Sequence, residues 1–462
     1  MNSIDFYLKL PYWGKVLASS WHGLRLKRWR YGGIYECEFH EAGEREKWSP
    51  LRLQEYQAIQ LANILRIALT DVPWYQEQVP IDPQSINSEN AHEKLFKFPI
   101  LEKEQVRADP KRFLNQRYQI SDLYEEHTSG TTGTPLRIYW SREMVQRWYA
   151  LAHRRWLGWV GVSAVDRWAL FGGQLVADIT RTSPPFWVRN WSMHQCYFSS
   201  YHIAPNYVSA YLYELQRFRP RYIMGYPSAL VSLVSLSRDI GLIWKGPPIK
   251  VIIGNAEPFY QWQRERVEGF FGCPSVDTYG SAEGIFMGVE CSRKHIHLCP
   301  DVGVWEIFGN DGKPLPIGQT GEFVCTGLLN DAMPLIRYRT GDDVALSSMD
   351  SDCGIPFPIL DHIEGRSDDM IILPDGRRIG RLDPIFKADF PICEAQIVQK
   401  NLSSVKVLIV PAKGFNSYEA IKILKAVKSR LGNQVEVHLD IVDSIPRTRY
   451  GKLQAVISSI SS

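Results

Sequence analysis

The sequence has almost no net charge and no long apolar segment. Its 53 lysines and arginines nearly balance its 50 aspartates and glutamates, which leaves a formal net charge of +3. This balance argues against a dedicated nucleic-acid-binding protein, which needs a strongly basic surface. No run of apolar residues approaches the roughly 18 that a membrane-spanning helix requires. The sequence also has no internal repeat, which excludes a solenoid.

Cysteine is sparse, and the eight cysteines are scattered over 462 residues. No signal-peptide pattern precedes them, so we expect reduced thiols or metal ligands rather than disulfides. Hydrophobic residues make up 45% of the chain and charged residues 22%, values that are typical of globular proteins. At about 150 residues per domain, the length indicates one large domain and a smaller one. We therefore expect a soluble cytoplasmic enzyme.

Residues 1–50 are interpreted as an N-terminal arm, and residues 1–31 within it are basic and aromatic. They carry six lysines and arginines against one acid, Asp5, and Trp13, Trp21 and Trp29 are interleaved with them. A basic helix with interfacial tryptophans can lie on an anionic membrane surface. The alternative is an arm that packs on its own domain or on a second subunit, as in a homodimer. The imperfect helical spacing favours the packed arm, and the basicity is too local for a nucleic-acid interface.

Helical and strand patterns alternate along the chain, which predicts an α/β fold. Residues 53–69 have helical spacing, residues 251–253 are typical of a buried parallel strand, and residues 275–279 are predicted as a second such strand. The pattern changes near residue 365. We place a domain boundary there, with a large domain over residues 1–364 and a smaller α+β domain over residues 365–462. Its expected elements are strands at 371–373, 405–410 and 435–441 and a helix at 420–431.

Residues 128–135 form a loop of glycine and hydroxyl residues, Thr-Ser-Gly-Thr-Thr-Gly-Thr-Pro. Its backbone N–H groups and hydroxyls can surround phosphate oxygens. The loop is not a Walker motif, because the Gly-Lys-Ser/Thr sequence is missing and residues 136–140 alternate like a strand instead of opening a helix. Taken alone, such a loop is more often a polar turn.

Five further motifs follow in a fixed order. Two of them come directly after predicted strands, where ligands bind in open α/β sheets. Each motif has an ordinary structural explanation by itself, but six of them in one order are hard to explain as coincidence. They are residues 254–258 (Gly-Asn-Ala-Glu-Pro), 279–284 (Tyr-Gly-Ser-Ala-Glu-Gly), 337–342 (Arg-Tyr-Arg-Thr-Gly-Asp), 365–369 (Gly-Arg-Ser-Asp-Asp) and 446–452 (Pro-Arg-Thr-Arg-Tyr-Gly-Lys).

With these motifs the sequence resembles the adenylate-forming acyl ligase superfamily. Within it, the sequence is similar to the phenylacetate–CoA ligase-like branch, which includes the CapK-type capsule-biosynthesis proteins. The resemblance runs from about residue 72 to Lys452, and the 128–135 loop and Lys452 are its most specific parts. It implies a large N-terminal domain with the nucleotide site and a small, mobile C-terminal domain. It also implies ATP- and Mg²⁺-dependent conversion of a carboxylate to an acyl-adenylate, with release of pyrophosphate.

The resemblance implies roles for the residues of the nucleotide site. The 128–134 loop would hold the β- and γ-phosphates, and Tyr279 would stack on adenine with Ala256 and Glu257 on the opposite wall. Asp342 would accept hydrogen bonds from the ribose hydroxyls. The implied ATP- and AMP-binding residues are Thr128, Ser129, Gly130, Thr131, Thr132, Gly133, Ala256, Glu257, Tyr279, Gly280, Ser281, Asp342 and Arg366.

Three of the implied residues are expected to take part in catalysis. Glu283 offers a hard oxygen ligand for Mg²⁺, and Arg366 supplies a fixed cation beside the ribose and phosphate. Lys452 would lie between the substrate carboxylate and the α-phosphate, where an ammonium stabilises the transition state more than the ground state. Asp368 is the implied hinge of the small domain.

The sequence defines the acyl pocket less clearly than the nucleotide site. The resemblance implies that His202, Tyr226, Pro227, Ser228 and Gly254 line it, as such pockets are mostly apolar with a few polar groups. An aromatic residue here can equally belong to the core, and His202 can equally be a structural histidine with satisfied hydrogen bonds.

A cysteine and histidine cluster raises the question of a metal. Cys291, His297 and Cys299 fall within nine residues, and Cys353 lies downstream. Some relatives hold a structural zinc with a Cys and a His from the first region and a Cys-x-Cys-Gly pair from the second. Ser351 breaks that pair here, and Cys299 could restore a Cys₃His set. The alternative is a group of buried thiols that act as small hydrophobic residues.

Three functions remain open from the sequence. The simplest is a ligase that joins a small carboxylic acid to CoA, with Arg377 and Arg378 available for the CoA phosphates. The second transfers the acyl group to an amine or hydroxyl, such as an amino sugar, and residues 375–380 and 394–399 look closer to the CapK-type branch. The third is an inactive scaffold, against which Lys452 and the complete 128–135 loop argue.

Overall fold

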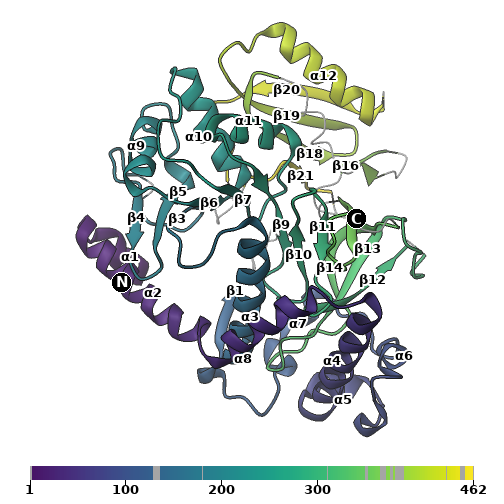
Figure 1. Ribbon diagram of the computed structural model, residues 1–462. Coiled ribbons are helices and arrows are strands. Elements are labelled where there is room, and N and C mark those ends of the chain that lie inside the picture. The colour runs from purple at the N-terminus through teal and green to yellow at the C-terminus, as the bar shows by residue number, and fades with distance from the viewer. Residues whose placement is uncertain are drawn as a thin grey trace. The chain divides into compact units, whose positions relative to one another are not determined.

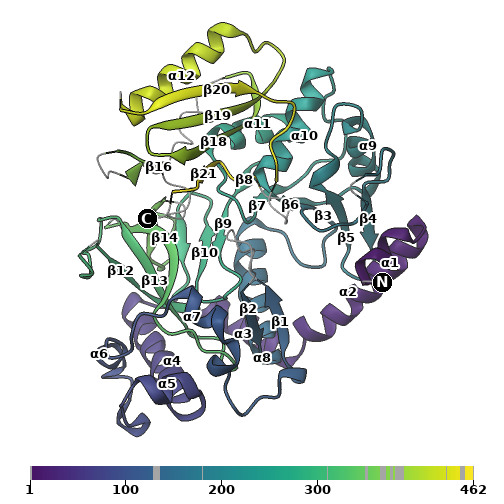
Figure 2. The ribbon, with the colours of Figure 1, turned by 180° about the vertical axis from the view of Figure 1, so that it is seen from behind.

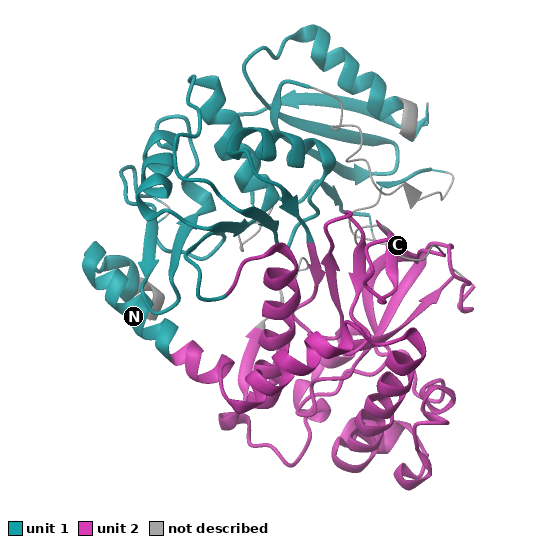
Figure 3. Cartoon of the chain, viewed as in Figure 1, with its two compact units in different colours: residues 1–24, 164–277, 364–462 teal, residues 25–163, 278–363 magenta. Residues whose placement is uncertain are grey.

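The computed structural model describes residues 3–127, 136–178, 180–309, 311–348, 352–364, 371–374, 378–379, 390–432, 434–447 and 453–460 (Figure 1). The chain forms two compact units (Figure 3). Unit 1 comprises residues 1–24, 164–277 and 364–462, and unit 2 comprises residues 25–163 and 278–363. Within the part of the chain that the structure describes, no helix combines the length and the apolar character needed to cross a membrane.

A six-stranded sheet with the order β4-β5-β3-β6-β7-β8 forms the centre of unit 1. Its strands pair in parallel except β4, which is antiparallel to β5. The predicted strand at 251–253 is confirmed as β7, whose side chains are buried because the parallel sheet packs within the core. The elements are β3 (Trp168–Gly172), β4 (Trp187–Asn190), β5 (Gln195–Ser199), β6 (Tyr222–Gly225), β7 (Val251–Gly254), β8 (Ser275–Val276), α9 (Val208–Phe218), α10 (Pro227–Asp239) and α11 (Gln261–Phe271).

The C-terminal part of unit 1 is a smaller α+β layer, as the sequence predicts. Its sheet has the order β20-β19-β18-β21, and α12 lies against it in Figures 1 and 2. Ile423, Val427 and Leu431 repeat every four residues and bury one face of α12 in the core of this layer. The elements are β16 (Ile371–Ile372), β17 (Arg378–Ile379), β18 (Ile392–Asn401), β19 (Ser404–Pro411), α12 (Ser417–Leu431), β20 (Glu436–Ile441) and β21 (Val456–Ser458).

Two helices begin the chain, α1 (Ser3–Lys9) and α2 (Tyr12–Arg30). The part of α2 that belongs to unit 1 packs beside β4 and β5. At Gly23 a Cβ atom would lie 2.2 Å from Ser192 Oγ, so only glycine allows this close approach. The expectation that the arm packs on its own domain is therefore met on one face of α2.

Unit 2 combines helices with a seven-stranded sheet of the order β12-β13-β14-β15-β11-β10-β9. The strand pairs whose register is described are antiparallel. The predicted helix at 53–69 is confirmed as α4, which starts with the Ser49 side chain accepting a hydrogen bond from Arg52 N. The segment at 136–140, which alternates like a strand in the sequence, forms β2 over Arg137–Trp140.

The helices of unit 2 are α3 (Gly33–Arg45), α4 (Pro50–Asp71), α5 (Pro73–Gln78), α6 (Ala91–Leu95), α7 (Lys103–Ala108) and α8 (Arg142–Ala152), followed by a π turn at His153–Leu157. Its strands are β1 (Tyr124–His127), β2 (Arg137–Trp140), β9 (Thr278–Gly280), β10 (Met287–Glu290), β11 (Ile296–Leu298), β12 (Gly303–Phe308), β13 (Gly321–Gly327), β14 (Tyr338–Leu346) and β15 (Ile359–Glu364).

The strand predicted over residues 275–279 is wrong as a single element. It divides into β8, which ends the parallel sheet of unit 1, and β9, which begins the antiparallel sheet of unit 2. The division falls at Asp277, whose Oδ2 accepts a hydrogen bond from Phe259 N at 3.0 Å. Phe259 is 18 positions away in the sequence, so the residues around Asp277 do not predict the break between β8 and β9.

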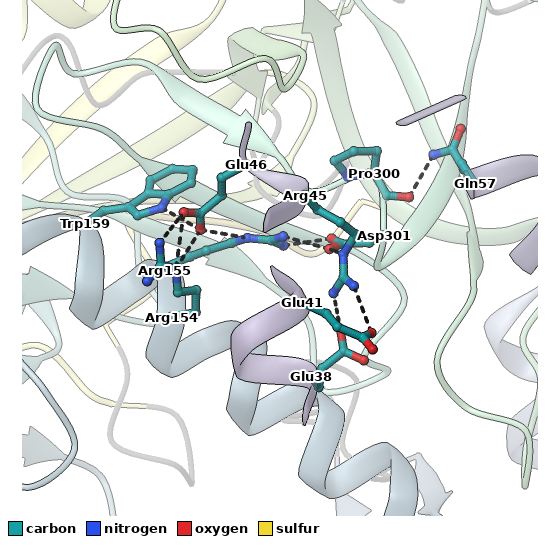
Figure 4. Close-up of polar contacts among 10 residues, drawn as sticks. All are labelled: Glu38, Glu41, Arg45, Glu46, Gln57, Arg154, Arg155, Trp159, Pro300 and Asp301. Carbon is teal, nitrogen blue, oxygen red and sulfur yellow. Dashed lines mark hydrogen bonds and ion pairs between the residues drawn. The ribbon is translucent and has the colours of Figure 1, made fainter. Parts of the chain in front are cut away.

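A buried ion-pair network lies inside unit 2 (Figure 4). Arg155, from the π turn, makes two hydrogen bonds of 2.7 Å to the two carboxylate oxygens of Asp301. Arg45, from the end of α3, donates to Asp301 Oδ2 at 2.7 Å and also contacts Glu38. Burial alone would raise the pKa of Asp301, but the two guanidinium groups outweigh it and hold that pKa well below its usual range.

Candidate active site

In unit 2 the structure brings Tyr279 and Asp342 together. The Tyr279 hydroxyl donates a hydrogen bond of 2.8 Å to Asp342 Oδ2. These residues come from β9, the edge strand, and β14, which is separated from it by three strands in the sheet order, and both are half-buried. The Tyr279 ring packs against Phe286 with a centroid separation of 4.7 Å. An aromatic ring held beside a carboxylate can stack on a base while the carboxylate binds hydroxyl groups.

Glu283 is buried in the same unit and lies beside two residues that the sequence analysis did not single out for the site. The Tyr338 hydroxyl donates a hydrogen bond of 3.0 Å to Glu283 Oε1. Lys103 Nζ, from α7, lies 3.8 Å from the same oxygen. Tyr338 belongs to the 337–342 motif and could have been found from it, whereas nothing in the sequence around Lys103 indicates this contact.

The donor set around Glu283 fits a Mg²⁺ ion bound with phosphates. A carboxylate supplies the hard oxygen that this ion prefers, and the nearby ammonium of Lys103 adds a positive charge suited to phosphate oxygens. Ser281 Oγ is buried and has no hydrogen-bond partner among the described residues. A buried hydroxyl without a partner is unusual, and a bound polar group would satisfy it.

In unit 1 the 254–258 loop meets the C-terminal tail at Glu257. Glu257 Oε2 accepts a hydrogen bond of 3.1 Å from Ser228 N, in the first turn of α10, where a carboxylate is favoured by the helix dipole. Its Oε1 accepts a hydrogen bond of 2.9 Å from Leu453 N. Burial raises the pKa of Glu257, against the lowering effect of these hydrogen bonds. Sequence reasoning assigned Glu257 to the adenine wall and missed its bond to the tail.

Side chains of α10 and α11 also hold the C-terminal sheet. Glu394 in β18 accepts a hydrogen bond of 3.0 Å from Ser232 Oγ and forms an ion pair with Arg447. Arg266 Nη1 donates to the carbonyl oxygen of Ile392 at 2.9 Å. Arg447 and Leu453, the described residues that flank positions 448–452, therefore both have contacts within unit 1.

Among the expected acyl-pocket residues, His202 has a partner for each ring nitrogen. Nε2 donates to the carbonyl oxygen of Asp178 at 2.8 Å, and Nδ1 lies 2.8 Å from Ser199 Oγ, which therefore donates to it. The ring stacks on Phe186, and burial lowers the pKa of His202, which favours the neutral imidazole. This arrangement agrees with the structural alternative for His202.

The other residues expected to line the acyl pocket lie at the ends of two neighbouring parallel strands. Tyr226, Pro227 and Ser228 follow β6 and open α10, with proline in the first turn, where its missing N–H costs nothing. Gly254 ends β7, and a Cβ atom there would lie 2.8 Å from the Phe259 ring. Ala256, two residues later, has φ of 63°, an uncommon left-handed conformation for a residue with a side chain.

Several predicted site residues lie outside the described residues. They are Thr128, Ser129, Gly130, Thr131, Thr132, Gly133, Arg366, Asp368 and Lys452. Their roles stay predictions, as does the domain boundary near residue 365.

Three of the four predicted zinc ligands come together in unit 2. One ligand atom each from Cys291, His297 and Cys353 lies within 4.8 Å of the other two. His297 Nδ1 lies 3.0 Å from the carbonyl oxygen of Phe357, to which it donates, and Nε2 lies 3.3 Å from Cys353 Sγ. The hydrogen bond from Nδ1 to Phe357 orients Nε2 toward the thiols, as metal-binding histidines require.

Cys299 is not part of this group. The chain turns directly after β11, and the Cys299 thiol contacts Arg155 of the ion-pair network. Burial raises the pKa of Cys299 to about 12. The prediction that Cys299 completes a Cys₃His set therefore finds no support in the geometry of the described residues.

Comparisons with known proteins show which proteins this chain resembles. The family model described as "CapK C-terminal domain" matches residues 371–459. The chain is 24% identical over 376 residues to Protein CapK of Staphylococcus aureus, covering 78% of this chain and 80% of that protein. It is 27% identical over 338 residues to the phenylacetate-coenzyme A ligase of Escherichia coli (strain K12), covering 70% of this chain and 72% of that enzyme.

A solved structure shares the fold. It is 2-hydroxyisobutyryl-CoA ligase in the postadenylation state, with a TM-score of 0.70 at 20% identity, covering 90% of this chain and 92% of that one. The expected α/β fold with a large N-terminal and a smaller C-terminal domain is thereby confirmed.

Proposed function

Since these similarities place the chain among the adenylate-forming acyl ligases, in the branch of the phenylacetate–CoA ligases and CapK, we propose that it activates a carboxylic acid with ATP. A carboxylate oxygen attacks the α-phosphorus, the bond from that phosphorus to the β-phosphate oxygen breaks, and an acyl-adenylate and pyrophosphate form. The observation that carries this proposal is the hydrogen bond between Tyr279 and Asp342, which joins the residues expected at adenine and ribose.

The residues near Glu283 would serve the phosphates. In this proposal Glu283 binds the Mg²⁺ ion, which neutralises phosphate charge when bound. Lys103 and Tyr338 position the Glu283 carboxylate, since both contact its Oε1. Lys452 would act on the carboxylate and the α-phosphate. The bond from Leu453 N to Glu257 supports this role, because it ties the residue next to Lys452 to the loop after β7.

For the second half-reaction we propose CoA as the acyl acceptor, as in the phenylacetate–CoA ligases. The second candidate is an amine or hydroxyl acceptor such as an amino sugar, and the match of residues 371–459 to the CapK C-terminal domain favours it. A screen of carboxylic acids for pyrophosphate release, with products identified by mass spectrometry, separates them. We expect an acyl-CoA whenever CoA is present.

The prediction that CoA is the acyl acceptor can be tested with a double variant of the small domain. If CoA binds the small domain, replacing Arg377 and Arg378 with alanine removes two phosphate partners and should raise the KM for CoA about tenfold, with the KM for ATP unchanged. Acyl-adenylate that persists with CoA and disappears only after an amine or sugar is added would establish the second candidate instead. Failure of every acid to release pyrophosphate would favour an inactive scaffold.

We also propose a structural zinc at Cys291, His297 and Cys353. Two thiolates and one imidazole are ligands that zinc prefers, and three of them leave one position of a tetrahedron for another donor. The burial of Cys291 and His297 and the hydrogen bond from His297 to the Phe357 carbonyl support a structural role.

Elemental analysis checks the zinc prediction. The purified protein should carry about one zinc per chain, and chelation should lower its melting temperature, since metal binding is coupled to folding at structural sites. Cys353→Ser should lose the zinc. Cys37→Ser is the control, because the exposed Cys37 thiol contacts Glu41 outside the cluster. Zinc-free protein that melts at the same temperature as the untreated protein would contradict the proposal.

A further inference from the structure

One face of α2 is fixed to unit 1. Val16 packs with Val176, Val188 and Tyr197. Ser20 Oγ accepts a hydrogen bond of 3.1 Å from Trp191 N, and the Ser20 carbonyl oxygen accepts one of 2.8 Å from Ser192 Oγ. In both views α1 and the first part of α2 lie beside β4 (Figures 1 and 2). These contacts therefore set which side of the helix faces away from the body of unit 1.

The exposed side of α2, next to the fixed side, carries large apolar side chains. Trp13 is 69% exposed and Trp21 is 66% exposed, and Leu17 and Leu24 are exposed as well. At 3.6 residues per turn, these four positions fall within an arc of about 80° on the helix. We call these four side chains the apolar stripe. Trp191, whose backbone N–H donates to Ser20, is 62% exposed and adds a third exposed indole beside the apolar stripe. Grouped apolar side chains of this size on a surface mark an interaction site.

The charge around the stripe has one sign. Residues 6–31 contain six basic residues and no aspartate or glutamate. Lys9 is exposed before the stripe, and Arg25 and Arg28 are exposed in the last turns of α2. By the same helical geometry Arg28 falls within the arc of the stripe, and Arg25 lies about 40° beyond Trp21. The stripe therefore has cations at both ends.

A second copy of this chain is a poor partner for such a surface. Two stripes packed against each other would bring basic residues together, and residues 6–31 offer no acid to pair with them. An anionic lipid surface complements both properties, because indole rings favour the boundary between headgroups and acyl chains and phosphates attract lysine and arginine.

We propose that α2 is a membrane-surface helix, which holds the protein on an anionic bilayer with Trp13, Leu17, Trp21 and Leu24 inserted at the level of the headgroups. The helix lies parallel to the surface and does not span it. The proposal is independent of the proposed ligase activity. It adds a location for that activity, namely the surface of an anionic bilayer.

Flotation with lipid vesicles tests the inference on the full chain. Vesicles of phosphatidylcholine alone are compared with vesicles of equal parts phosphatidylcholine and phosphatidylglycerol. We expect binding to the anionic vesicles that weakens as salt is raised, since screening reduces the attraction of exposed charges. Trp13→Ser with Trp21→Ser should weaken this binding at least about tenfold, because two interfacial indoles are lost. Arg25→Gln with Arg28→Gln should weaken it on anionic vesicles only.

The matched control is Tyr213→Ser, an exposed aromatic residue on α9 that should leave binding unchanged. Melting temperatures of all variants check that the fold is kept. Equal binding to both kinds of vesicle, or no loss in the double tryptophan variant, would overturn the proposal. A dimer in analytical ultracentrifugation that the double tryptophan variant abolishes, without vesicle binding, would show that the stripe is a contact between subunits.

Discussion

Asp301→Asn is expected to lower the free energy of unfolding by about 3–5 kcal/mol. The substitution keeps the size of the side chain and removes its charge, which leaves the guanidinium groups of Arg45 and Arg155 buried with reduced compensation. Loss of one partner of a buried ion pair has a cost of this size because the remaining charge stays desolvated. Urea unfolding, followed by fluorescence and by circular dichroism, measures the change.

The control for Asp301 is Glu44→Gln. Glu44 pairs with Lys47 at 2.8 Å, and both side chains are well exposed. Exposed pairs contribute roughly 0–1 kcal/mol, so this variant should unfold almost as the natural protein does. If Asp301→Asn behaved like this control, Glu38, which contacts Arg45, and Glu46, which lies 3.8 Å from Arg155, would have to balance both arginines without Asp301.

The effect of Asp301 should depend on pH in one direction. Its pKa is lowered in the folded protein, so its stabilising contribution is complete above the unfolded value of about 3.9 and is lost as the pH falls toward the folded value. The difference in stability between the natural protein and Asp301→Asn should therefore be constant near neutral pH. It should shrink only below about pH 4.

Lys452→Ala should slow formation of the acyl-adenylate by about 100-fold or more. Two anionic groups approach each other in this step, and removal of an oriented charge from such a transition state has an effect of this order. Pyrophosphate release in the absence of any acceptor measures the step. ATP binding, measured by calorimetry, should change much less, since the residues proposed for adenine, ribose and phosphates lie elsewhere in the chain.

Lys425→Ala is the control for Lys452. Lys425 is an exposed lysine on α12 of the same small domain, so it tests the loss of a positive charge without a role in the site. An unchanged rate of pyrophosphate release in Lys452→Ala would remove the lysine from the mechanism. It would leave Arg366 and Lys103 as the candidate cations.

Local sequence patterns predict a helix or strand correctly where the residues of that element alone determine its structure. The run Val-Ile-Ile predicts β7 because β-branched residues buried on both faces suit a parallel strand, and the apolar spacing of residues 53–69 predicts α4. The motif order also pointed to Tyr279 and Asp342, which the structure joins by a hydrogen bond.

Local sequence patterns do not predict the features of the structure that depend on contacts between residues far apart in the sequence. The break at Asp277 depends on Phe259, and the position of Cys299 depends on Arg155. Lys103 reaches Glu283 across 180 positions of sequence, and Leu453 reaches Glu257 across 196 positions. Such contacts form only when the whole fold brings the elements together, so they cannot be predicted from neighbouring residues in the sequence.

The two units are interleaved along the chain, and this order constrains how the protein can fold during synthesis. Unit 1 begins with α1 and the first part of α2. The strands that α2 contacts, β4 and β5, emerge from the ribosome more than 150 residues later, and the last strand of the unit, β21, completes the sheet beside β18. Unit 2 likewise waits for residues 278–363. Contacts of such long sequence separation form slowly, because large loops must close first. A nascent chain therefore exposes the apolar residues of α2 for much of its translation, which makes this helix a natural binding site for a chaperone.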